Sequence, residues 1–143
     1  DALPRCVLHL VEIVILKFTM VQDEERLMYY ASCDIAVFPS KYEPFGIVCT
    51  EAQSMGKPVV VGARGISGLR EQVIPTGNEI CGFHINPYDP LDIATYVVKI
   101  LKDPDLAATM GKNGRSRVLK HFTWETASDN TIGIYQELID GRK

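Results

Sequence analysis

Two carboxylates, Glu43 and Glu51, stand eight residues apart in the stretch 40–58, which reads SKYEPFGIVCTEAQSMGKP. The residues between them indicate a loop that runs into a helix, so Glu43 is expected above the helix start and Glu51 about a turn and a half inside it. Two carboxylates at different distances from one point can hold separate hydroxyl groups of one ligand. On a helical surface the same spacing is also common among ordinary solvated charges, so the pair alone is a weak signal.

The residues between the two carboxylates favour an anion at the helix start. The run 34–39, DIAVFP, has strand character and ends at a proline. Pro44 then suits the first turn of a helix, where a missing N–H costs nothing, and Gly46 lets a ligand approach the backbone closely. Free amides at a helix N-terminus bind phosphate or a polar hydroxyl, so the whole layout suits a nucleotide sugar. The amides expected to be free are those of Phe45, Gly46 and Ile47.

Other phosphate-binding and catalytic patterns find no support in the sequence. Gly62, Gly65 and Gly68 are spaced three and three, unlike the G-x-G-x-x-G motif of dinucleotide-binding proteins. The chain has no G-x-x-x-x-G-K phosphate loop and no G-x-S-x-G nucleophile elbow. A retaining glycosidase needs two carboxylates that face each other across a sugar, and a pair along one loop and helix does not suit that chemistry.

With these motifs in place, the chain resembles the retaining glycosyltransferases of GT-B fold, family 4 (glycosyl transferases group 1). The C-terminal domain of that family carries a Glu, seven residues and a second Glu, usually around Glu-Pro-Phe-Gly, and Glu43 and Glu51 fit this spacing. The resemblance extends from about Val11 to the end of the chain. The matching segments are 34–40, 51–52, 56–60, 65–71, 103–106 and 122–125.

The resemblance implies a nucleotide-diphosphate sugar as donor, and it leaves a UDP-, GDP- or ADP-sugar open. In the family the first Glu contacts the transferred sugar, which makes Glu43 the catalytic position, and the second Glu hydrogen-bonds the ribose, which falls on Glu51. The nucleobase pocket falls near Met20 and Val21, and Thr19 stands where the family usually has a glycine. The amides that bind the sugar and phosphate fall on Phe45, Gly46, Ile47 and Val48.

The same resemblance implies parts that this chain does not carry. The family's C-terminal domain begins with a further strand and helix, whose Arg and Lys clamp the diphosphate, and a separate N-terminal domain holds a carbohydrate or lipid acceptor. We therefore expect residues 1–143 to be a single nucleotide-sugar-binding domain of a larger enzyme, inactive alone and prone to dimerise through an uncovered sheet edge. The alternative is a non-catalytic donor-binding or interaction module. Peripheral membrane association is a further option for the parent enzyme.

Composition excludes several classes of protein. The 143 residues carry a net charge of −3, with 46% apolar and 23% charged residues, as in a globular domain. The basic residues form no run longer than two, which argues against nucleic acid as a partner. The four cysteines form no C-x-x-C pair, which predicts reduced thiols in the cytoplasm. The histidines lack ligand spacing, so no metal is expected. No cofactor is expected either.

The remaining sequence predicts an α/β fold, a Rossmann-like doubly wound parallel sheet with helices on both faces and a helical C-terminal segment. The apolar run 6–18 is too short and too interrupted by charge for a membrane span, and it reads instead as part of a buried strand. Trp124 is expected to be a core or helix-anchoring residue. Strands are expected at 11–19, 34–39, 59–62 and 81–85, and helices at 23–32, 45–55, 67–73, 91–101, 105–121 and 124–138.

Overall fold

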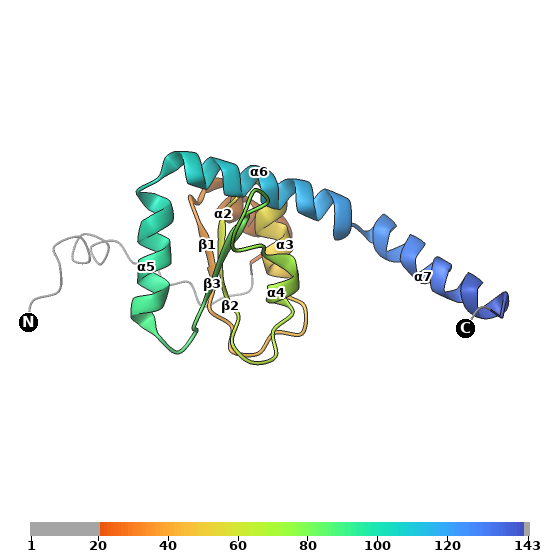
Figure 1. Cartoon of the computed structure of the whole chain (residues 1–143). Helices are drawn as coiled ribbons and strands as arrows, with labels where there is room; N and C mark the ends of the chain where they lie inside the picture. The colour runs from red at the N-terminus through yellow and green to blue at the C-terminus, as the bar shows by residue number, and fades with distance from the viewer. Residues whose placement is uncertain (1–20, 142–143) are drawn as a thin grey trace, which may run out of the picture.

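The computed structural model describes residues 21–141 of the chain (Figure 1). The strand expected at 11–19 and the predicted nucleobase residue Met20 lie outside these residues. In chain order the elements are α2 (Asp23–Ser32), β1 (Ala36–Phe38), α3 (Ile47–Ser54), β2 (Val59–Gly62), α4 (Leu69–Gln72), β3 (Gly82–Ile85), α5 (Pro90–Leu101), α6 (Pro104–His121) and α7 (Trp124–Ile139).

The sheet of the described residues has three parallel strands in the order β1-β2-β3. Ala36 pairs with Val59, and Val59 pairs in turn with Gly82. Every residue of the central strand β2 is buried. A continuous apolar strand of this kind is typical of a parallel sheet that is covered on both faces, because neither side of the strand meets water.

Helices cover both faces of this sheet, as the sequence predicts. α3 and α4 lie on one side and α5 on the other (Figure 1). Right-handed connections from β1 to β2 and from β2 to β3 place α3 and α4 on the same face. The core on that face consists of Ala36, Cys49, Ala52, Val59, Val61, Leu69, Val73 and Cys81. The core on the α5 face, which α6 also covers, consists of Val60, Phe83, Ile85, Ile100 and Met110.

Two thiols belong to the core on the α3 and α4 face. Cys49 and Cys81 are free and fully buried. Burial raises the pKa of Cys49 to about 12, and burial also raises the pKa of Cys81, since an apolar environment disfavours the thiolate. The thiolate is the nucleophilic form of cysteine, so both residues serve packing rather than chemistry.

The helices α5 and α6 begin with the same local device. The Asp89 side chain accepts a hydrogen bond of 3.0 Å from the Leu91 amide, and Pro90 occupies the first helical position. Asp103 caps α6 in the same way, and Pro104 follows it. Aspartate at the cap satisfies an amide that has no partner inside the helix, and proline at the next position has no amide to satisfy. These signals explain why both helices start within one residue of the predicted position.

Other boundaries differ more from the predicted ones. α3 begins at Ile47 rather than at residue 45, because its N-cap Gly46 has a φ of 91°, outside the helical region. The first predicted strand of the described residues, 34–39, shortens to Ala36–Phe38. The expectation that Trp124 packs in the core is wrong, since its exposed fraction is 84%.

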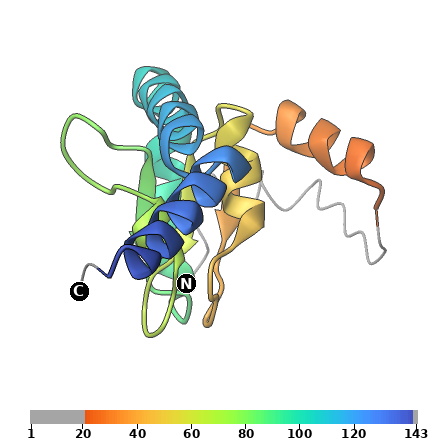
Figure 2. The same cartoon turned by 90° about the vertical axis from the view of Figure 1, so that its right-hand side faces the viewer.

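The helix α2 lies at one side of the molecule in Figure 2, and α7 extends away from the rest in Figure 1. Neither contains a buried residue. α7 projects beyond the end of α6, and its large apolar side chains Ile132, Tyr135 and Leu138 are all exposed. Among residues 21–141, no helix combines the length and the apolar character that a membrane crossing requires.

His84 on β3 predicts a pH dependence of stability. Its Nε2 atom lies 2.9 Å from the Val73 carbonyl oxygen, and burial, assisted by the charge of Arg70, lowers the pKa of the imidazole below its ordinary value. The folded state therefore binds fewer protons than the unfolded state. The contribution of His84 to the free energy of unfolding is complete above about pH 6.5 and is lost as the pH falls through the lowered folded-state pKa.

We expect the free energy of unfolding, measured with urea, to fall more steeply below about pH 6.5 in the natural protein than in a His84→Gln variant. The glutamine keeps an N–H near the Val73 carbonyl but cannot become charged in this range. Parallel pH curves for the two proteins would show that His84 carries no such penalty.

Candidate functional site

The residues of the predicted site meet where the loops that follow β1 and β2 lie side by side. Glu43 and Ser67 form a parallel bridge between the two loops. The Gly68 amide donates a hydrogen bond of 2.7 Å to the Glu43 carbonyl oxygen, and the Ser67 hydroxyl donates one of 2.9 Å to the Gly62 carbonyl oxygen. Both loops follow the carboxyl ends of parallel strands, which is the edge of an α/β sheet where ligands usually bind.

Close backbone contact between these loops depends on glycine. A Cβ atom at Gly62 would collide with the Ser40 carbonyl oxygen, and one at Gly68 would collide with the Pro44 carbonyl oxygen. Neither partner is the end of a flexible side chain, so the loops could not keep this distance with any other residue. The absence of two side chains thus brings Glu43 next to the start of α3.

The start of α3 offers amides without partners. Gly46 has φ 91° and ψ 64°, which turns the chain into the helix, and its carbonyl oxygen accepts from the Cys49 amide at 3.0 Å. The N–H groups of Gly46, Ile47 and Val48 find no acceptor among the described residues. Gly46 is itself buried, and unpaired N–H groups in buried residues are rare in proteins. An acceptor supplied by a ligand would complete this helix terminus.

Glu43 lies beside this helix terminus. A Cβ atom at Gly46 would lie 3.1 Å from the Glu43 Cγ atom, so the side chain passes close to the glycine. Glu43 is half-buried, and its carboxylate forms neither a hydrogen bond nor an ion pair with any other described residue. It therefore keeps its full capacity to accept hydrogen bonds from a ligand's hydroxyl groups.

Glu51 lies one turn further along α3, and it is already engaged. Arg26 of α2 holds it through two parallel hydrogen bonds, from Nε to Oε2 at 3.1 Å and from Nη2 to Oε1 at 2.9 Å. This hydrogen bonding to Glu51 is the first cause of a raised Arg26 pKa. The charge of Glu51 also adds to burial in raising the pKa of Tyr30. A two-pronged contact fixes the plane of the carboxylate and leaves part of each oxygen's accepting capacity unused.

No role for Arg26 is expected from the sequence. The sequence indicates an ion pair of Arg26 only weakly. Arg26 is the only basic residue of α2, whose sequence DEERLMYYAS opens with three acids. The pair of Arg26 with Glu51 can be inferred only after α2 and α3 are known to pack together.

Of the other predicted residues, Phe45, Ile47 and Val48 lie at the start of α3, whereas Val21 lies before α2. Phe45, Ile47 and Val48 are exposed, and the Phe45 and Phe122 rings pack in a T-shaped arrangement with 5.9 Å between their centroids. Val21 is half-buried just before α2. An apolar cavity of about 300 Å³ adjoins Phe45. Its lining residues are Phe45, Ile47, Thr50, Phe122, Thr123, Trp124 and Ala127.

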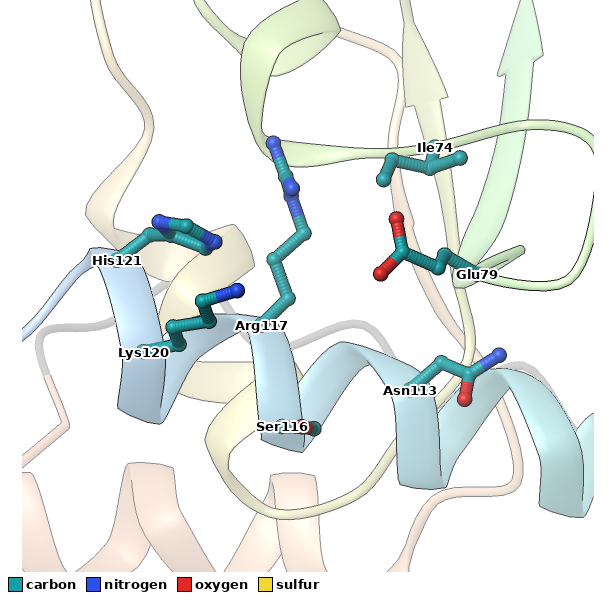
Figure 3. A pocket seen from close by; sticks show the side chains of 7 residues that line it. All are labelled: Ile74, Glu79, Asn113, Ser116, Arg117, Lys120 and His121. Atoms are coloured by element: carbon teal, nitrogen blue, oxygen red, sulfur yellow. The ribbon is translucent and has the colours of Figure 1, made fainter.

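A second, polar pocket lies between α6 and the segment that precedes β3, away from the loops just described (Figure 3). Its volume is about 160 Å³. Arg117 reaches from α6 toward the end of α4, and Glu79 lies on the other side of the pocket. None of the predicted site residues lines this pocket. Across residues 21–141, no group of histidine, cysteine or acidic side chains is arranged to hold a metal ion.

Comparison with known proteins gives a consistent result. The model of the family described as glycosyl transferases group 1 matches residues 11–117. The MMP alpha-(1->4)-mannosyltransferase of Mycolicibacterium hassiacum is 31% identical over 83% of this chain and 28% of its own length. A glycogen synthase of Mycobacterium tuberculosis is 37% identical over 78% of this chain and 26% of its own length.

Solved structures show the same pattern. A sucrose-phosphate synthase from Thermosynechococcus elongatus superposes with a TM-score of 0.74 and 37% identity, over 87% of this chain and 30% of the other. HepE of Anabaena, in complex with UDP-glucose, superposes with a TM-score of 0.65 and 25% identity, over 76% of this chain and 29% of the other. The chain spans about a quarter to a third of the length of the relatives it matches.

Gly46 allows a direct test of the helix start. A Cβ atom at Gly46 would lie 2.5 Å from the Leu69 Cδ2 atom, whereas one at Gly77, which also has a positive φ of 81°, would meet open space. We expect Gly46→Ala to lower the free energy of unfolding by about 1 to 3 kcal/mol more than Gly77→Ala, because only the first adds a steric conflict to the strained backbone. Equal losses in urea unfolding would mean that Leu69 moves aside without cost.

Proposed function

Because the chain belongs to the family of glycosyl transferases group 1, we propose that it binds the nucleotide-diphosphate sugar donor of a retaining glycosyltransferase. The observation that carries this proposal is the set of unpaired amides at the start of α3 between two carboxylates, Glu43 and Glu51. The likeness to HepE, which was solved with UDP and with UDP-glucose, supports the same class of ligand.

In this proposal the diphosphate lies at the start of α3. The amides of Gly46, Ile47 and Val48 donate to its oxygens, and the helix dipole favours its negative charge. During transfer the bond between the sugar's anomeric carbon and the diphosphate oxygen breaks, and the electron pair stays with the diphosphate. The anomeric carbon forms a bond to the hydroxyl oxygen of the acceptor, whose proton passes to the departing diphosphate. Fixed amides that already point at the leaving group stabilise the growing charge without rearranging.

The carboxylates hold the two ends of the donor. Glu43, whose carboxylate has no partner among residues 21–141, accepts hydrogen bonds from hydroxyl groups of the transferred sugar, whose ring gains positive character as the bond breaks. Glu51 accepts from the ribose hydroxyls. Arg26 acts through Glu51 by fixing the orientation of its carboxylate. Val21, together with Met20 outside the described residues, is the proposed neighbourhood of the nucleobase.

The acceptor is part of the proposal but not of this site. The described residues carry one set of ligand-binding groups at the sheet edge, and an acceptor needs a second surface facing it. We propose that a separate domain of the whole protein holds a carbohydrate or lipid acceptor, so that residues 1–143 bind the donor but do not catalyse transfer alone. Sugar transfer by the purified 143-residue chain would overturn this division of roles.

Substituting the carboxylates tests the site. Replacing Glu51 by Ala removes charge-assisted hydrogen bonds worth about 1.5 to 3 kcal/mol, so the affinity for UDP should fall by about 10- to 150-fold in calorimetry. Arg26→Met keeps the carboxylate and should weaken binding less. Glu79→Ala removes the same charge from the distant polar pocket and should leave binding unchanged.

Glu43 should behave differently from Glu51. In the whole enzyme we expect Glu43→Ala to lower turnover more than donor affinity, because its hydrogen bonds tighten as the sugar becomes positive. Unchanged UDP affinity in Glu51→Ala, or a Glu43→Ala loss confined to donor binding, would contradict the assigned roles.

Chelation tests how the diphosphate charge is balanced. The described residues hold no group suited to a divalent ion, and the amides of α3 take that place in the proposal. We therefore expect sugar transfer by the whole enzyme to survive an excess of EDTA. Complete loss that magnesium restores would show that a metal bridges the phosphates.

A further inference from the structure

Two glutamines are fully buried in this chain, and they have different surroundings. Gln53 and Gln72 each carry an Oε1 atom without a hydrogen-bond partner in the described structure. The Gln53 Nε2 atom lies 3.5 Å from the Cys81 sulfur, within the core. The Gln72 Nε2 atom donates to the Phe45 carbonyl oxygen at 2.5 Å, at the start of α3. Burying an amide with half of its hydrogen-bonding groups unpaired is costly, so the bond that Gln72 does make calls for an explanation.

That bond fixes the orientation of one peptide unit. The described part of the chain has no cis peptide bond. In the trans peptide between Phe45 and Gly46, the C=O and the N–H therefore lie in one plane and point in opposite directions. Because Gln72 holds the Phe45 oxygen, the Gly46 N–H must point away from Gln72. Because Gly46 can adopt backbone conformations that other residues avoid, the Phe45–Gly46 peptide could also rotate so that its N–H points the other way. The direction of the Gly46 N–H therefore needs a restraint.

The short helix α4, which carries Gln72, is itself held firmly. On the side of the site, its Leu69 side chain packs against Gly46, and the preceding Gly68 amide bonds to the Glu43 carbonyl. On the other side, Arg117 of α6 donates from Nε to the Gln72 carbonyl oxygen at 2.9 Å and from Nη2 to the Glu71 carbonyl oxygen at 2.6 Å. Figure 3 shows Arg117 extended from α6 toward this point.

We infer that Gln72 is a positioning residue of the donor site: its buried side-chain amide locks the Phe45–Gly46 peptide so that the Gly46 N–H faces the bound diphosphate. This inference rests on the proposed function, since it supplies the reason why one orientation of the peptide is needed. Arg117 contributes indirectly by anchoring α4. Preorganised amides bind an anion without the cost of turning toward it, which is why a restraint at this peptide raises affinity.

Gln53 provides a matched control for the test. Gln72→Met and Gln53→Met both replace a fully buried glutamine by a flexible apolar side chain of similar size, and both remove an unpaired Oε1. Only the first removes the bond to Phe45. We expect Gln72→Met to weaken UDP binding in calorimetry by about tenfold or more, and Gln53→Met to change it less than about twofold, at similar melting temperatures.

A second measurement needs no ligand. The ¹⁵N–¹H resonance of Gly46, and the hydrogen-exchange rate of its amide, should change in Gln72→Met relative to both the natural protein and Gln53→Met, because the peptide loses its restraint. If Gln72→Met fails to fold, Gln72→Leu replaces it in both experiments.

The outcomes separate the inference from the proposed function. Equal UDP affinities for the two variants, with the natural protein binding UDP, would overturn the role of Gln72 and leave the donor site standing. No binding of UDP by the natural protein would count against the donor site itself. In that case an unchanged Gly46 amide in Gln72→Met would overturn the inference as well, and a changed one would uphold the lock on the peptide.

Discussion

The site depends on the close approach of two loop backbones, those that follow β1 and β2. Gly62 and Gly68 permit this approach, because any side chain there would meet a carbonyl oxygen of the neighbouring loop. The positions of Glu43, of the turn at Gly46 and of the α3 amides depend on this approach, because the loop after β2 contacts the loop after β1 along its backbone. The sheet edge alone would place two loops near each other, but it would not fix a carboxylate beside a helix terminus.

The helix α6 holds α3, α4 and the segment before β3 together through hydrogen bonds. Three of its polar side chains donate to backbone carbonyl groups of other segments: Arg115 to Ser54 at the end of α3, Arg117 to the end of α4, and Asn113 to Ile80 before β3. Carbonyls at helix ends have no partner inside their own helix, so the two arginines satisfy those of α3 and α4. All three bonds tie α6 to other segments. One long helix thus fixes the far ends of both short helices that carry the site.

The sequence predicted the elements of this fold well and its long-range contacts poorly. The helix at 23–32 and the strand at 59–62 have the predicted bounds, because their signals are local: acids in a first turn, and an unbroken apolar run before a glycine. Glu43 lies in the loop before α3, as its position in the sequence suggests, because loop and helix start are adjacent along the chain. The ligand-binding roles of Glu43 and of the α3 amides stay predictions. The bonds from Arg26 to Glu51 and from Gln72 to Phe45 join residues 25 and 27 positions apart. No local pattern encodes them, because they exist only once α2 and α4 have packed against α3.

The buried thiols of Cys49 and Cys81 have a practical consequence. They sit between the sheet and the helices that carry the site, and at neutral pH they are almost wholly in the unreactive protonated form. An alkylating reagent can modify them only when α3 or α4 lifts from the sheet. The rate at which these two thiols are labelled therefore measures how often α3 and α4 separate from the sheet next to the candidate site in the absence of any ligand.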